Sequence, residues 1–139
     1  MVVKVKKNIS KKLFLLFFIG LFLPMLSYGD DAFDNLTFAI KNQATKIHFQ
    51  ELSRKYKGER IEGKGYVVNV NKNVDGETVV NLSTEKDPSS PKYVSIVVFV
   101  RDYFSEKTLK LKPGKYVRFF GNFDEIRMKT IIIREGIVK

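Results

Sequence analysis

The sequence predicts a mainly β protein, in which a small five-stranded barrel follows one or two N-terminal helices. From Asp30 to Lys57, apolar residues recur at spacings of three and four, as on one face of an amphipathic helix. From Glu59 onward the spacing changes to two, and short runs rich in Val, Ile, Tyr and Phe alternate with turn residues. The change of period divides the chain into a helical segment, residues 30–57, and a barrel, residues 58–139.

The first 29 residues have the pattern of a secretory signal peptide. Met1 to Lys12 contains five lysines and no acidic residue, and the 14 residues from Leu13 to Leu26 are almost all apolar. Small residues follow at the two positions that a signal peptidase reads, Ser27 and Gly29. The apolar run is shorter than the ~20 residues of a membrane-spanning helix. We therefore expect cleavage near Gly29, no stable membrane span afterwards, and a periplasmic or secreted protein; an uncleaved membrane anchor is the alternative.

Cleavage would halve the net charge. The whole chain has 25 basic and 15 acidic residues, a net charge of +10. Five lysines and no acid lie in residues 1–29, so 20 basic and 15 acidic residues remain, a net charge of +5. A mildly basic domain permits an anionic partner without requiring one. The chain has no cysteine, which excludes disulfides, thiolate metal sites and a lipid anchor on cysteine.

The helical segment divides into two helices. Phe33, Leu36 and Ile40 form one apolar stripe, which predicts the first helix. Thr45 is a suitable N-cap for a second helix, and Gly58 can adopt the left-handed conformation that ends it.

The barrel segment contains five predicted strands and one short helical turn. Asp75-Gly76 and Pro113-Gly114 are tight-turn sequences, and Ser105 is a candidate cap for a helical turn over residues 105–111. The predicted strands are Arg60–Val70, Glu77–Thr84, Tyr93–Tyr103, Tyr116–Phe123 and Thr130–Val138. Three strands, a helical turn and two more strands are the order of the OB-fold, a five-stranded Greek-key barrel.

Alternation along three strands assigns residues to the barrel interior. One side of each strand is apolar or glycine, and small residues suit the bends of a closed barrel. The residues expected to point inward are Gly63, Gly65, Val67, Val94, Ile96, Val98, Val100, Val117, Phe119, Gly121 and Phe123. Asn69 would continue this side in the first strand, so the assignment there is the weakest.

Two segments of the barrel carry a family resemblance. Residues 56–67 read YKGERIEGKGYV, and residues 111–121 read LKPGKYVRFFG. Both resemble bacterial envelope OB-fold proteins of the tRNA-anticodon-binding-like group, over about residues 55–139. The chain departs from the group's pattern at Glu59, where a lysine is usual, and at Lys115, where an aspartate is usual. The resemblance implies an OB-fold and a kinship with nucleic-acid binders, although this fold serves many ligands.

We expect neither a metal nor a cofactor. Asn71–Gly76 imitates the start of a calcium loop, but Leu82 stands where the loop needs an acid, so a hairpin turn is the better interpretation. His48 is the only histidine, and a surface or half-buried packing role is expected for it.

The sequence also offers no catalytic constellation. The carboxylates occur as neighbours, Asp30-Asp31 and Asp124-Glu125, and neighbours on a strand point to opposite faces. We expect Asp124 and Glu125 to cap the loop between the last two strands. The protein is therefore predicted not to be an enzyme.

The candidate ligand surface is the outward face of the first three strands. By alternation this face holds Lys64, Tyr66, Val68, Val79, Asn81, Tyr93, Val97, Phe99 and Arg101. It is more aromatic and apolar than a solvated surface needs to be, and OB-folds bind ligands there. The predicted ligand-binding residues are Tyr66, Tyr93, Phe99 and Arg101 at the centre, with Lys72, Arg127 and Lys129 at the rim. The alternative is that the N-terminal helices cover this face.

These observations predict a secreted or periplasmic, non-enzymatic OB-fold binding module. Its ligand would be an oligomeric or anionic molecule, such as a nucleic acid or a glycan, or a protein. The alternative is a structural or inhibitory protein that docks on an envelope protein through a barrel edge or its helices. Strong salt dependence of binding would favour an anionic ligand.

Overall fold

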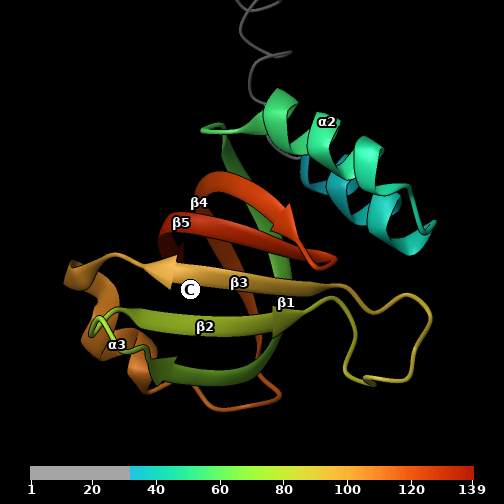
Figure 1. Cartoon of the computed structure of the whole chain (residues 1–139). Helices are drawn as coiled ribbons and strands as arrows, with labels where there is room; N and C mark the ends of the chain where they lie inside the picture. The colour runs from blue at the N-terminus through green and yellow to red at the C-terminus, as the bar shows by residue number, and fades with distance from the viewer. Residues whose placement is uncertain (1–31) are drawn as a thin grey trace, which may run out of the picture.

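The computed structural model describes residues 32–139 (Figure 1). The predicted signal peptide, residues 1–29, and the neighbouring carboxylates Asp30 and Asp31 lie outside the described residues. No helix within residues 32–139 is long and apolar enough to cross a membrane.

Two helices precede the barrel, as predicted. The first occupies residues 32–41, and the second, α2, is Lys46–Tyr56. Thr45 caps α2, because its side-chain oxygen accepts a hydrogen bond of 3.2 Å from the backbone N–H of His48. Gly58 follows α2 with a φ of 81°, the left-handed conformation that glycine adopts at least cost.

Five strands and a short helical connection follow. The strands are β1 (Arg60–Lys72), β2 (Thr78–Ser83), β3 (Ser95–Val100), β4 (Tyr116–Arg127) and β5 (Thr130–Val138). A 3₁₀ helix, η1 (Asp102–Phe104), and the helix α3 (Ser105–Leu109) lie between β3 and β4.

Three local predictions were wrong. β3 is shorter than expected at both ends, because it begins only at Ser95, after Tyr93, and the chain leaves the sheet at Arg101 and turns into η1. β4 is longer, so Asp124 and Glu125 lie within a strand rather than in a loop. Ser105 is the first residue of α3 rather than its cap, and its hydroxyl is hydrogen-bonded to that of Thr78.

The strands form a closed barrel in the order β1-β2-β3-β5-β4. β3 and β5 run parallel, and the other neighbouring strands run antiparallel. Closure depends on β1, which pairs with β4 over Arg60–Tyr66 and with β2 over Tyr66–Lys72. A closed five-stranded barrel of this order, with a helix between the third and fourth strands, is an OB-fold. The predicted fold class is confirmed.

Every residue expected to point inward is buried, those of β1, β3 and β4 and also Val94, which comes just before β3. Val98 and Phe119 are both 0% exposed. The alternation in β1 breaks at an irregularity of register between Val67 and Asn69, which is the pattern of a β-bulge. As a result Asn69 is exposed, and Val70 packs against the core instead.

The N-terminal helices pack at the end of the barrel opposite α3, beside β4 (Figure 1). Leu36 and Tyr56 belong to the same hydrophobic core as the barrel interior. The ring of Phe33 meets that of Phe119 edge to face, with 5.3 Å between their centroids. Phe33 also fills the space beside Gly63, so this glycine is explained by a close approach of two rings.

Candidate ligand-binding surface

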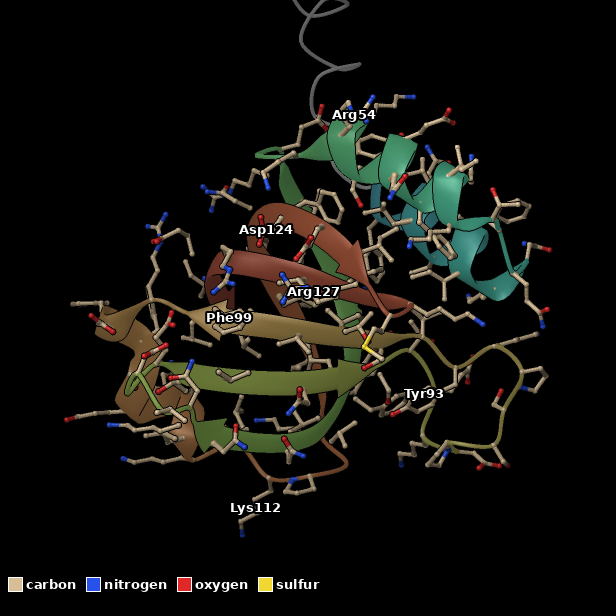
Figure 2. All side chains as sticks on the ribbon, in the orientation of Figure 1. Arg54, Tyr93, Phe99, Lys112, Asp124 and Arg127 are labelled. Carbon is tan, nitrogen blue, oxygen red and sulfur yellow. The ribbon has the colours of Figure 1, made fainter. Side chains whose placement is uncertain are left out.

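Most of the outward face of β2 and β3 lies away from the helix pair (Figure 1), and the end of the first helix comes near this face only beside Tyr93 and Ser95. Phe99 stands near one end of β3 on this face (Figure 2), and it is half-buried. The register places it opposite Val79 of β2, while β5 lies on the other side of β3. A ligand on this face would therefore contact β2, β3 and β5.

Arg134 of β5 lies directly over Phe99. The guanidinium carbon is 3.8 Å from the centroid of the ring, which is a stacking distance. The Nε atom of Arg134 is 3.4 Å from Oδ2 of Asp124 on β4, and the other carboxylate oxygen is 3.0 Å from Nζ of Lys57. One ring and one carboxylate therefore fix the position of this guanidinium.

The two cations also change the chemistry of Asp124. The hydrogen bond from Lys57 is the main cause of a lowered pKa for this carboxyl group, and Arg134 adds to it. Partial burial raises the pKa, but its influence is weaker than that of the Lys57 hydrogen bond. Asp124 is therefore ionised at neutral pH and can hold both cations.

Beside this stack is a cavity of about 360 Å³ between β3, β5 and the β1–β2 turn. Arg101 lines it together with Phe99 and Arg134. Its Nε atom is 3.3 Å from Oε2 of Glu135, and half of the Arg101 side chain is exposed. The lining contains two guanidinium groups, each with a carboxylate partner, and three carboxylates, those of Glu77, Asp102 and Glu135.

The other predicted aromatic residues lie elsewhere. Tyr66 faces Tyr116 of β4, with 4.7 Å between ring centroids, and Nζ of Lys86 is 5.5 Å from the Tyr66 ring. Tyr93 lies beyond the other end of β3 from Phe99 (Figure 2), and six residues of extended chain span roughly 20 Å.

The predicted rim residues also separate. Lys129 and Tyr93 both line a hollow of about 280 Å³. Arg127 and Lys129 line a larger groove, of about 820 Å³, between α2 and the β4–β5 turn. Lys72 is exposed at the end of β1 and lines none of these spaces. The seven predicted residues therefore do not form one site. Phe99 and Arg101 line one cavity, Tyr93 and Lys129 line a second, and Arg127 and Lys129 line the groove.

Sequence reasoning missed Arg134 and Tyr116. Alternation along β5 does put Arg134 outward with Ile132, but no sequence pattern gives the parallel register of β5 on β3. Tyr116 was missed because the closure of β1 on β4 decides which residue faces Tyr66. Alternation along each strand predicts that both side chains point outward, but it does not predict which residues of the neighbouring strands they contact.

The calcium-like stretch and the single histidine can both be placed in the structure. Residues 32–139 contain no group of three or more side chains placed to hold a metal ion. The calcium-like stretch forms the β1–β2 turn, where Oδ1 of Asn73 accepts a 2.9 Å hydrogen bond from the N–H of Glu77. His48 is exposed on α2, with Nδ1 3.9 Å from Oε2 of Glu51.

Solved OB-fold structures are similar to this chain at low identity. A Klebsiella pneumoniae lipoprotein, for which nucleic-acid binding has been suggested, is 13% identical over 67% of this chain and 80% of its own, with a TM-score of 0.49. A small single-stranded DNA-binding protein from Streptomyces coelicolor is 14% identical over 55% of this chain and 86% of its own, with a TM-score of 0.43. The Plasmodium falciparum single-stranded DNA-binding protein, solved with single-stranded DNA, is 16% identical over 57% of this chain and 90% of its own, with a TM-score of 0.36.

No protein-family model matches the chain, and no curated protein is similar to it.

Proposed function

We propose that this OB-fold protein is an exported, non-enzymatic module that binds single-stranded nucleic acid across the outer face of β2, β3 and β5. The observation that carries the proposal is the guanidinium of Arg134 stacked on Phe99 and held by Asp124. Export to the periplasm or the medium rests on the pattern of residues 1–29. Kinship with the tRNA-anticodon-binding-like group of envelope proteins, which residues 56–67 and 111–121 resemble, is part of the same proposal.

The stack suits a base because it presents a flat, charged surface that is already ordered. The face of Phe99 is occupied by Arg134, so the ring supports the guanidinium rather than meeting the ligand itself. The Arg134 side chain is 42% exposed, which leaves guanidinium surface for a planar ligand. A base stacked on an aromatic ring gains about 1–3 kcal/mol, and here the planar guanidinium of Arg134 would take the place of the ring.

Arg101 supplies the second element that a nucleic acid needs. It lines the same cavity as the stack, and half of its side chain is exposed. An arginine can hold a phosphate with two parallel hydrogen bonds. Binding a phosphate would require Arg101 to exchange its contact with Glu135, which is an exposed pair and therefore weak.

The proposal is tested by fluorescence anisotropy of the exported chain with a labelled oligothymidylate, titrated at several salt concentrations. We expect affinity to fall as salt rises, and Arg134→Ala to weaken binding about tenfold, the lower part of the stacking range. Arg134→Lys keeps the charge but loses the plane, so it should also weaken binding. The matched control is Lys112→Ala, on the α3–β4 turn far from the stack (Figure 2).

Two outcomes would reject the proposal. One is no measurable binding of the oligothymidylate at low salt. The other is equal affinity for the unmodified chain, Arg134→Ala and Lys112→Ala, which would show attraction by net charge alone. Tighter, equally Arg134-dependent binding of a sulfated glycan of matched length would assign the same surface to an acidic glycan instead.

A further inference from the structure

The groove between α2 and the β4–β5 turn has an apolar floor and a basic rim. Its volume is about 820 Å³. Phe49 of α2, Ile126 of β4 and Met128 of the turn contribute apolar surface. Neither Phe99 nor Arg134 lines it, so the groove is separate from the proposed nucleic-acid surface.

The rim of the groove carries more positive than negative charge. Lys46 and Arg54 line the groove from α2, and Arg127 and Lys129 line it from the β4–β5 hairpin. The only acidic lining residue is Glu125, which forms an ion pair with Arg127. Within residues 32–139, Lys46, Arg54 and Lys129 have no acidic partner. The rim therefore favours a partner that carries carboxylates.

The turn that borders the groove has an unusual sequence for its conformation. Met128 and Lys129 join β4 to β5 as a two-residue turn, with φ angles of 51° and 61°. Such turns normally use Asn-Gly, and a left-handed conformation costs a residue with a side chain about 1–2 kcal/mol. The turn leaves Met128 93% exposed at the groove. A flexible, polarisable side chain of this kind adapts to varied apolar partners.

One wall of the groove is a strand edge. The pairing of β4 with β1 ends at Asn122, yet β4 continues to Arg127, so its last residues have β5 on one side only. On the other side the N–H of Ile126 donates a 3.0 Å hydrogen bond to Oγ of Ser53 on α2. In a strand, the N–H and C=O of one residue point to the same side, so the carbonyl of Ile126 also points toward α2.

From these features we infer that the groove binds a short extended polypeptide segment of a partner protein, one that carries acidic and apolar side chains. The apolar side chains would lie on Phe49 and Met128, and the carboxylates would meet the basic rim. Because Ser53 of α2 already accepts the N–H of Ile126, recognition would rest on the apolar lining and the basic rim rather than on addition of a strand. The inference concerns a second surface and does not depend on the proposed nucleic-acid function.

The inference is tested with a panel of synthetic peptides in which Glu or Asp alternates with Leu or Phe at different spacings. Chemical-shift mapping on the isotope-labelled exported chain locates binding, and anisotropy measures affinity. We expect the acidic peptides to shift amides of α2 and of the β4–β5 turn. Composition-matched peptides with Lys in place of the acids should shift none of them.

Variants of exposed residues make the result specific. The double charge reversal Lys46→Glu, Arg54→Glu should weaken peptide binding at least tenfold, and Met128→Ser should weaken it several-fold. The matched control is the double reversal Lys110→Glu, Lys112→Glu, which changes the net charge equally but lies outside the groove. It should weaken peptide binding much less than the groove reversal does. Arg134→Ala should not change peptide binding, which separates this inference from the proposed function.

Three results would overturn the inference. Acidic peptides that shift no groove amides would do so, as would equal losses of affinity from the groove and control reversals. Groove amides that shift with oligothymidylate but with no peptide would assign the groove to the nucleic acid instead.

Discussion

The guanidinium carbon of Arg134 lies 3.8 Å from the ring centroid of Phe99, although 35 positions separate the two residues in the sequence. The parallel pairing of β3 with β5 brings them together. Because Arg134 occupies the face of the ring, the two side chains form one platform. Their contributions to binding should therefore be coupled.

Phe99→Ala and Arg134→Ala should each weaken oligothymidylate binding about tenfold, and the double variant should be little worse than either single one. The reason is that Phe99 acts through the guanidinium that it supports. Anisotropy titrations of the three variants measure the coupling. Arg101→Ala should add its own loss to that of Arg134→Ala, since Arg101 pairs with Glu135 instead. Fully additive losses for Phe99 and Arg134 would contradict the single platform.

Asp124→Asn should change how stability depends on pH. The hydrogen bond from Lys57, and then Arg134, lowers the pKa of Asp124 in the folded protein. Because the pKa of Asp124 is lower in the folded than in the unfolded chain, its ionised form stabilises the fold at pH values above the unfolded-state pKa of about 3.9. This contribution is lost as the pH falls through the folded-state pKa. The Tm difference between the unmodified chain and Asp124→Asn should therefore be largest near neutral pH and shrink below about pH 4. Asp75→Asn, in the exposed β1–β2 turn, is the control.

Val98→Asp should cost several kcal/mol of unfolding free energy, because Val98 is 0% exposed and an unpaired carboxylate would be buried there. Denaturant unfolding of the purified chain measures the loss. Val74→Asp places the same side chain on a fully exposed residue of the β1–β2 turn and should change stability little. Unchanged stability of Val98→Asp would mean that β3 presents its other face to the core.

Gly63→Ala should cost about 1–3 kcal/mol, because a Cβ at this position would overlap the rings of Phe119 and Phe33. The cost should be smaller in a Phe33→Ala background, where one of the two rings is absent. Phe33 belongs to the helical segment and Gly63 to the barrel. The unfolding curves of these single and double variants therefore also test whether residues 30–57 and 58–139 unfold together. Separate unfolding transitions for the two segments would contradict a shared core.

The protein recovered from an envelope or secreted fraction should begin at or near Asp30. The expectation rests on the basic start, the apolar run of 14 residues and the small residues at Ser27 and Gly29. Intact-mass spectrometry of the recovered protein checks it. A full-length chain in the cytosol would contradict export, and a full-length chain in the membrane would favour the uncleaved anchor.

The sequence by itself determined the elements and their inner faces. Period-2 alternation identified Val98 and Phe119 as core residues, and Thr45 and Gly58 marked the ends of α2. These properties follow from local chemistry: side chains alternate along a strand, and caps satisfy nearby backbone groups. The order of elements was then enough to identify the OB-fold.

Only the tertiary structure decided which outward residues share a surface. Tyr66 and Phe99 both point outward as predicted, but closure of β1 on β4 places Tyr66 beside Tyr116, and the β3–β5 register places Phe99 under Arg134. The polar Asn69 at an inward position was a sign of the bulge after Val67, but the early end of β3 at Val100 left no mark in the alternation. Long-range register depends on how the whole barrel closes, so the neighbours of a residue on a curved sheet cannot be read from its own strand.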